Sequence, residues 1–218
     1  MINKDLKVAV LGAGAMGCLF GGLLAEKGLN VILIDVWKEH VDIINKNGLK
    51  MDGYGGDRLI KVKATNEPSK LDIVDAVIVM CKATALEPAL NSIKNIIGEK
   101  TSFMSFQNGI GHESIMQKIV GKEKVLGGTT TQASNILGPG HIKNHAALPS
   151  WIGEYDGGVS ERVNMISETF SAYGLEMIAA DDVKKRKWMK LFALTAIGPL
   201  SAIFDLHHTD LYLSLIHI

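Results

Sequence analysis

One lysine near the end of the chain has the surroundings of a proton donor. Lys190 lies in the stretch "RKWMKLF", at the start of a long apolar run. In a helix it would neighbour Arg186 and Lys187 one turn back. One turn on it would neighbour Ala193 and Leu194, so like charge and partial desolvation would lower its pKa from about 10.4. Such an ammonium can protonate a carbonyl oxygen while hydride arrives at the carbon. The spacing alone favours a simpler interpretation, a solvated lysine whose stem lies on apolar surface.

A glycine-rich turn near the other end of the chain is the second candidate. The stretch "GAGAMG" has the G-x-G-x-x-G spacing and lies between an expected strand and an expected helix. There the glycines allow a tight turn, close approach of the backbone to a pyrophosphate and close helix packing, and the helix N-terminus faces the anion. A glycine turn that serves packing alone is the alternative. The expected cofactor contacts in the turn are Gly12, Ala13, Gly14, Ala15, Met16 and Gly17.

An acidic residue follows the glycine turn at a suitable distance. Asp35 ends the second expected strand, 18 residues after Gly17, where a carboxylate can accept hydrogen bonds from an adenosine ribose. This favours NAD over NADP, because the carboxylate would repel a 2′-phosphate. Two alternatives remain open: Lys38 or another nearby cation could neutralise it, or Asp35 could be a simple strand-end cap.

These residues need elements to position them, and the first third of the chain supplies a βαβ unit. The apolar pattern predicts strands over 7–12 and 30–35, separated by the glycine turn and a helix over 16–28. A helix over 36–48 follows. The stretch 49–66 alternates around a glycine-rich turn, as a hairpin would.

A second and a third cycle of strand and helix follow. The pattern predicts a strand over 76–82 and a helix over 84–97, with Thr84 as its N-cap. A strand over 101–106 and a helix over 112–120 come next. Strands that alternate with helices predict an α/β fold with a parallel, doubly wound sheet of the Rossmann type.

The next part of the chain is richer in strands. Strands over 125–134, 141–147 and 150–155, a helix over 160–173 and a strand over 175–181 are expected to complete the sheet.

The pattern then becomes wholly helical. Asp181 and Asp182 are well placed at a helix N-terminus, so we expect a domain boundary there. Residues 1–181 would form the dinucleotide-binding domain, and residues 182–218 the beginning of an all-helical C-terminal domain.

The composition argues against several other classes of protein. The chain has a formal net charge of +0, which gives no field to gather nucleic acid or an anionic membrane. Cys18 and Cys81 lie in apolar stretches and are expected to be buried hydrophobes in a reducing, cytoplasmic setting. His141 and His145 are expected strand residues, so no metal site is expected.

Two apolar runs must be weighed as membrane segments. Residues 8–25 form an uncharged run, but their glycines suit a strand, turn and helix better than one continuous helix. Residues 191–204 are too few for a bilayer, which takes about 20.

Several stretches together resemble the motifs of the ketopantoate reductases (2-dehydropantoate 2-reductases). They are "LGAGAMG", "VMCKA", "QNGIG", "GGTTTQAS", "GPGHI", "WIGE", and "KWMKL" followed by "GPLSA". The resemblance covers nearly the whole chain. It implies an N-terminal Rossmann domain and a helical C-terminal domain, with the active site in the cleft between them.

The resemblance also implies roles for single residues. Lys190 matches the family's catalytic lysine, while Lys82 and Asn108 match positions that contact the cofactor near its phosphates and nicotinamide. Ser134 matches a further cofactor contact. Independently, Lys82 and Asn108 follow the carboxyl ends of two expected strands, where doubly wound sheets bind ligands.

Three positions depart from the family pattern. The family's substrate-binding asparagines fall at Leu194, Gly198 and His208, and a leucine and a glycine cannot make an asparagine's hydrogen bonds. The resemblance implies NADP, whereas Asp35 favours NAD. The family's further serine and glutamate would lie beyond Ile218, so the chain is expected to be a C-terminally truncated member.

The expected function is NAD(P)H-dependent reduction of a 2-keto acid, with 2-dehydropantoate, the precursor of pantoate in pantothenate biosynthesis, as the first candidate substrate. An NAD-dependent D-2-hydroxyacid dehydrogenase of the same family is an alternative. A nucleotide-binding module without catalysis is another. The expected partner is a small-molecule substrate, with no nucleic acid and no membrane, and a homodimer is possible.

Overall fold

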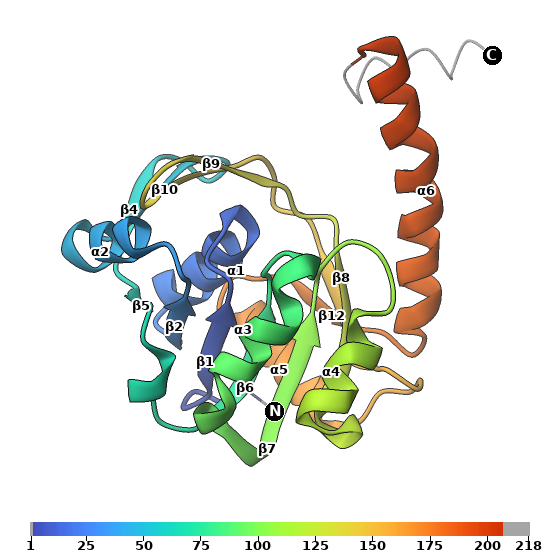
Figure 1. The fold of residues 1–218 in the computed structure, drawn as a ribbon, viewed down its shortest axis with the longest axis horizontal. Coiled ribbons are helices and arrows are strands. Elements are labelled where there is room, and N and C mark those ends of the chain that lie inside the picture. Colours follow the sequence, from blue (N-terminus) through green and yellow to red (C-terminus); the bar gives the residue numbers. More distant parts are fainter. Residues whose placement is uncertain (1, 207–218) are drawn as a thin grey trace.

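The computed structural model describes residues 2–206, and a long twisted sheet of eight strands forms their centre (Figure 1). Neighbouring strands are parallel, except for β8 and β11, which are antiparallel. In spatial order the strands are β12 (Met177–Ala179), β11 (Ser150–Glu154), β8 (Val125–Thr130), β7 (Ile97–Ser105), β6 (Val74–Val79), β1 (Lys7–Leu11), β2 (Asn30–Ile34) and β5 (Lys63–Thr65).

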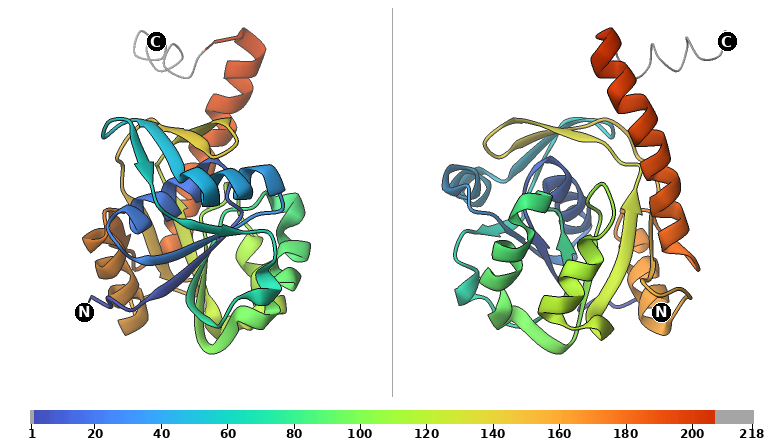
Figure 2. Two further views of the ribbon diagram at one scale, coloured as in Figure 1. Left: turned by 90° about the vertical axis from the view of Figure 1, so that its left-hand side faces the viewer. Right: turned by 45° about the vertical axis from the view of Figure 1, so that its right-hand side comes forward.

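Helices cover both faces of this sheet, as expected for a doubly wound fold (Figure 2). Successive residues of a strand point to opposite faces, so Val8 and Val10 join one buried cluster while Ala9 and Leu11 join the other. The helices α1 (Ala15–Glu26), α2 (Lys38–Asn47) and α5 (Glu161–Ala172) contribute to the first cluster, and α3 (Leu86–Ser92) and α4 (His112–Val120) to the second.

A second, four-stranded sheet arches over α1 (Figure 1). Its order is β4 (Arg58–Ile60), β3 (Leu49–Gly53), β10 (His141–Asn144) and β9 (Ser134–Gly138). The hairpin expected over 49–66 is confirmed for residues 49–60 as the antiparallel pair of β3 and β4. Residues 63–65 of the same stretch instead form β5, which pairs in parallel with β2 in the main sheet. The expectation that all later strands complete the main sheet is wrong for β9 and β10, because β10 pairs in parallel with β3 and buries Ile142 in the core beside α1.

The single helix expected over 84–97 is also wrong. Thr84 lies in a 3₁₀ turn (Ala83–Ala85), α3 starts only at Leu86 and has no side-chain cap, and a second 3₁₀ turn (Lys94–Ile96) follows it. The strand β7 begins at Ile97, which pairs with Val74, so pairing within the sheet takes over residues that the apolar pattern assigned to a helix. Two further 3₁₀ turns are Pro68–Lys70 and Lys122–Lys124.

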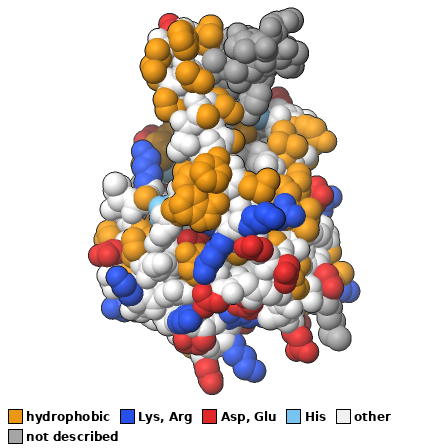
Figure 3. Space-filling model, turned by 90° about the vertical axis from the view of Figure 1, so that its right-hand side faces the viewer, with side chains coloured by type: hydrophobic (Ala, Val, Ile, Leu, Met, Phe, Trp, Pro, Cys, Tyr) orange, Lys and Arg blue, Asp and Glu red, His pale blue; other side chains and the backbone are white. Residues whose placement is uncertain are grey.

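The last element, α6 (Val183–Phe204), leaves the body of the molecule after its first turns. As expected, an acidic residue caps it: the Asp182 carboxylate accepts a hydrogen bond from the backbone N–H of Lys185 at 2.9 Å. Further along, several large apolar side chains are exposed, with Phe192 at 66% and Ile203 at 73%, and apolar groups gather on this part of the helix (Figure 3). Within residues 2–206, no helix is both long and apolar enough to cross a bilayer.

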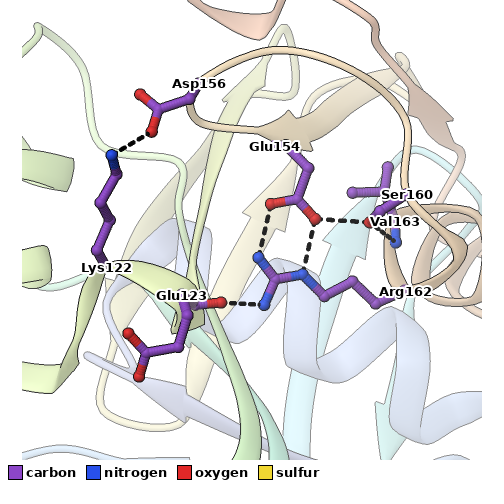
Figure 4. A network of polar contacts seen from close by, with 7 residues as sticks. All are labelled: Lys122, Glu123, Glu154, Asp156, Ser160, Arg162 and Val163. Carbon is purple, nitrogen blue, oxygen red and sulfur yellow. Dashed lines mark hydrogen bonds and ion pairs between the residues drawn. The ribbon is translucent and has the colours of Figure 1, made fainter.

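An ion-pair network joins β11, the start of α5 and the 3₁₀ turn before β8 (Figure 4). Arg162 donates two hydrogen bonds to the Glu154 carboxylate, at 2.7 and 2.6 Å, and a third to the Glu123 carbonyl. The Ser160 hydroxyl donates to Glu154 at 2.6 Å. Burial raises the pKa of Glu154, but the hydrogen bonds from Arg162 and Ser160 outweigh it, and the pKa lies below its usual value. The network therefore ties β11, which contacts α6, to α5 and to the turn that precedes β8.

Candidate functional site

The glycine turn has the geometry that the sequence predicted. Gly12 has a φ of +97°, and a Cβ there would collide with the backbone nitrogen of Cys81 at the end of β6. A Cβ on Gly17 would collide with the Gly12 carbonyl oxygen. At Gly14, by contrast, a Cβ would meet nothing within 4 Å. Two glycines therefore close the turn, and the third leaves open space in front of the N-terminus of α1.

Side chains hold the turn in this shape. The Ala13 N–H donates to the Asp35 carboxylate at 2.7 Å, and the Trp37 N–H donates to the other oxygen of Asp35 at 3.0 Å. The buried Cys18 thiol donates to the Ala13 carbonyl at 3.0 Å. Asp35 is thus a cap of the turn as well as an acidic group at the end of β2. Sequence reasoning left ribose binding and a cap as alternatives for Asp35; the structure shows the cap, and ribose binding stays a prediction.

Two hollows have Cys81 in their lining. The first has a volume of about 170 Å³ and is lined by Gly12, Asp35, Val36, Asn66 and Cys81, together with apolar groups. The second is a cleft of about 680 Å³, lined among others by Met16, Cys81, Lys82, Asn108, Ser134, Lys190 and Leu194. Residues of the glycine turn line both hollows, Gly12 the first and Met16 the second, so an extended ligand that follows the turn can reach both.

Lys190 lies at the cleft with its ammonium group fixed. Its Nζ donates a hydrogen bond to the Thr130 carbonyl at 2.7 Å, at the end of β8. Burial, and after it the positive charge of Lys187, lowers the pKa of Lys190. One donor position is used by Thr130, which leaves the other N–H groups for a ligand in the cleft. The simpler interpretation of a solvated lysine does not describe this half-buried, oriented side chain.

A buried ion pair fastens α6 to α4 one turn before Lys190. Lys187 and Glu113 are almost fully buried, and the Lys187 ammonium donates to one oxygen of the Glu113 carboxylate. Among residues 2–206, the other carboxylate oxygen has no hydrogen-bond partner. Close packing adds to this contact, because Val183 of α6 lies so near Gly127 of β8 that a Cβ on this glycine would collide with the valine side chain. The pair therefore helps to fix the position of Lys190.

We expect Glu113→Ala to lower the free energy of unfolding by about 3–5 kcal/mol, because it leaves the Lys187 ammonium buried without a counter-ion. The joint replacement of Glu113 by Leu and Lys187 by Met removes both charges and should cost far less. Urea unfolding of the wild type and the two variants measures both effects. A single variant within about 1 kcal/mol of the wild type would show that the pair does not hold α6.

The other expected site residues are not all brought together. Leu194 lines the cleft, but Gly198, one turn further along α6, is not among the residues that line it. His208 lies outside the described residues. Lys82 and Asn108 are exposed at the rim, and the Asn108 carbonyl accepts a hydrogen bond from His112 Nε2 at 2.8 Å.

Sequence reasoning missed several residues of the cleft. Thr130 and Gln132 line the cleft and lie in the segment "GGTTTQAS", of which the sequence analysis singled out only Ser134. Gln107 donates to the Cys81 carbonyl and accepts from Ser105, and so braces the floor between two strand ends. The segment's polar composition was the available signal, but nothing in the sequence says which of its side chains face the cleft.

The polar groups that line the two hollows fit a dinucleotide. An open helix N-terminus and Lys82 are suited to phosphate groups, Asp35 to ribose hydroxyls, and the buried Ser134 hydroxyl, which has no hydrogen-bond partner among the described residues, to a polar ligand atom. A proton donor, Lys190, lies in the same cleft. The arrangement can bind a nucleotide and protonate a second ligand beside it.

Comparison with known proteins agrees with this geometry. Residues 8–157 match the family described as ketopantoate reductase PanE/ApbA. The 2-dehydropantoate 2-reductase of Pyrococcus horikoshii is 35% identical over 200 residues, and that of Lactococcus lactis is 31% identical over 203 residues. The aligned regions cover 92% of this chain in both cases, but 64% and 65% of the relatives. The chain thus spans just under two thirds of their length.

Solved structures of related enzymes share the fold of this chain. A ternary structure of D-mandelate dehydrogenase with NADH and anilino(oxo)acetate has a TM-score of 0.85 and 31% identity, over 92% of this chain and 65% of the other. A 2-dehydropantoate 2-reductase from Geobacter metallireducens has a TM-score of 0.85 and 28% identity, over 92% and 66%.

Proposed function

The chain belongs to the ketopantoate reductase PanE/ApbA family, and on this premise we propose that it reduces a 2-keto acid to a 2-hydroxy acid with a nicotinamide dinucleotide. The observation that carries the proposal is the cleft, in which the fixed ammonium of Lys190 faces the same space as Lys82, Asn108 and Ser134. If the glycine turn served packing alone, the neighbouring cleft would have no need of a lysine with a fixed ammonium group. The two free cysteines fit the reducing, cytoplasmic setting that we also propose.

The residues that would hold the dinucleotide lie along both hollows. The turn from Gly12 to Gly17 would receive the pyrophosphate, Asp35 the adenosine ribose, and Lys82, Asn108 and Ser134 the part nearer the nicotinamide. When bound, the reduced nicotinamide supplies a hydride to the carbonyl carbon. The chain's own task is to fix both ligands and to provide the proton.

Lys190 provides that proton. The Thr130 carbonyl orients its ammonium, and a free N–H donates to the carbonyl oxygen of the keto acid. As negative charge develops on that oxygen, the N–H bond breaks, the O–H bond of the alcohol forms, and the neutral amine remains. Its lowered pKa makes the transfer easier than from an ordinary lysine. Protonation from solvent then restores the ammonium.

Two candidate substrates are supported by different observations. We propose 2-dehydropantoate as the first candidate, since the matched relatives are 2-dehydropantoate 2-reductases. Leu194 favours a second candidate, because an apolar side chain at the cleft suits a 2-keto acid with an apolar substituent. That candidate is an NAD-dependent D-2-hydroxyacid dehydrogenase, and a structural neighbour of this chain is a D-mandelate dehydrogenase.

The carboxylate of Asp35 should select the cofactor. No lysine or arginine is among the residues that line the smaller hollow, so a 2′-phosphate there would face Asp35 without a counter-ion. We expect NADH to bind at least about tenfold more tightly than NADPH, and Asp35→Asn to narrow this ratio to about threefold or less. Calorimetric titration measures both. Equal or tighter binding of NADPH by the wild type would contradict the prediction and would favour neutralisation by Lys38.

A matched control for this experiment is Asp72→Asn. Asp72 is exposed and precedes the N-terminal end of β6, whereas Cys81 and the site lie beyond its C-terminal end. The same loss of one negative charge should therefore leave the NADH to NADPH ratio unchanged. A change of equal size in both variants would mean that net charge, rather than Asp35, sets the preference.

The test of the proposed function follows the oxidation of NADH by this chain with a panel of keto acids. The panel contains 2-dehydropantoate, pyruvate and benzoylformate. Preference for 2-dehydropantoate supports the first candidate, and preference for benzoylformate the second. Binding of a dinucleotide without any turnover would overturn the enzymatic proposal in favour of a nucleotide-binding module. Absence of binding by a folded chain would overturn it altogether.

A further inference from the structure

A buried glutamine beside Lys190 has an unused hydrogen-bond acceptor. Gln132 lines the cleft and is 9% exposed, and its Oε1 has no partner among the described residues. Its backbone is fixed, because its N–H donates to the Thr130 hydroxyl at 3.0 Å, and that hydroxyl also bonds to Ser150 at 2.7 Å. The backbone of Gln132 is thus fixed two residues after Thr130, whose carbonyl orients Lys190.

An unpaired buried acceptor of this kind is unusual. Folded proteins pair nearly all their buried polar atoms, because each unpaired one costs about 1–3 kcal/mol. The Ser134 hydroxyl, two residues further on, also lacks a partner and lines the same cleft. Two unpaired polar groups on one wall indicate a polar ligand that completes them.

The chemistry of the possible ligands decides which one meets Gln132. The reacting end of a 2-keto acid carries a carboxylate and a ketone, which are acceptors only, so it suits the ammonium of Lys190 and not an amide oxygen. A nicotinamide carries a carboxamide, with an NH₂ donor and a carbonyl acceptor. A glutamine side chain has the same two groups, so two amides can form a reciprocal pair of hydrogen bonds.

We propose that Gln132 binds the carboxamide of the nicotinamide and is a specificity-determining residue for the cofactor, an inference that rests on the proposed function. The pairing satisfies Oε1 through the carboxamide NH₂. It also restrains rotation of the ring about its glycosidic bond, and so fixes which face of the ring is turned toward the substrate. Gln132 acts by binding and orienting, while Lys190 retains the proton transfer.

Three ligands separate this role from a general contribution to folding. NAD⁺ carries the carboxamide, its 3-acetylpyridine analogue replaces the NH₂ by a methyl group, and ADP-ribose lacks the ring. Calorimetric titration of the wild type should show NAD⁺ binding roughly tenfold more tightly than the analogue. In Gln132→Leu, NAD⁺ and the analogue should bind equally, and ADP-ribose should bind as it does to the wild type.

The control variant is Gln117→Leu, which makes the same substitution on α4 at a different hollow of the surface. It should keep the wild-type ratio. Equal affinity of the wild type for NAD⁺ and the analogue, or a loss of ADP-ribose binding in Gln132→Leu, would overturn the inference and leave the proposed function intact. Failure of the wild type to bind any of the three would overturn both.

Discussion

We expect Lys190→Met to slow the reduction of 2-keto acids by about 10²–10⁴-fold while the affinity for NADH stays within about threefold of the wild type. Methionine keeps the length and the apolar stem of lysine but cannot donate a proton. The Thr130 carbonyl then loses its donor, and the developing oxyanion has no acid to protonate it. Turnover and calorimetric titration on the same preparation separate chemistry from binding.

Lys185→Met is the matched control, because this exposed lysine lies on the first turn of the same helix. It should leave both turnover and NADH affinity unchanged.

The wild-type rate should fall as pH rises through the pKa of Lys190, since only the protonated form is an acid. That fall should occur below the ordinary pKa of a lysine, because burial and Lys187 lower it. Full activity of Lys190→Met would remove Lys190 from the mechanism.

The second large effect is expected at Gly17, where Gly17→Ala should lower the free energy of unfolding by more than about 4 kcal/mol or prevent folding. In an unconstrained helix, alanine in place of glycine stabilises by about 1 kcal/mol. Here the added Cβ collides with the Gly12 carbonyl oxygen, a backbone atom that no rotamer change can move. Chemical denaturation measures the loss, and a stability equal to the wild type would show that α1 can shift away from the turn.

Gly14→Ala is the informative partner of this variant. Gly14 has an extended backbone with a φ of −66°, and a Cβ there meets nothing within 4 Å, so the fold should keep its stability. The same Cβ projects into the space in front of the helix N-terminus. We therefore expect dinucleotide affinity to fall at least tenfold without a change in unfolding. Unchanged affinity would mean that the pyrophosphate does not approach the turn at this residue.

Local sequence patterns predicted the elements that have strong local signals. The end of α2 at Gly48 and the cap of α6 at Asp182 are fixed by backbone sterics and short hydrogen bonds between residues that are close in the sequence. The spacing of the glycine turn is also a strong local signal, although Asp35 and Cys81, which are remote in the sequence, complete its packing. The helix expected over 84–97 was wrong, because its last residue pairs with Val74 in the sheet. Pairing between distant strands overrides local propensity, and no local pattern reports it.

The sequence by itself determined the chemical groups that this protein offers: a glycine turn before a helix N-terminus, a carboxylate at Asp35 and a lysine with basic and apolar neighbours. Only the tertiary structure decided which of these groups act together. The order of the strands places the Thr130 carbonyl against Lys190, sixty residues later in the chain, and the packing of α6 buries Lys187 on Glu113. The same packing makes Gln132 a wall of the cleft. The spacing of residues along a chain fixes helix faces and turns. Contacts between remote segments depend on how the sheet and its helices pack. That packing is decided by the burial of many apolar side chains, each of which contributes little free energy by itself.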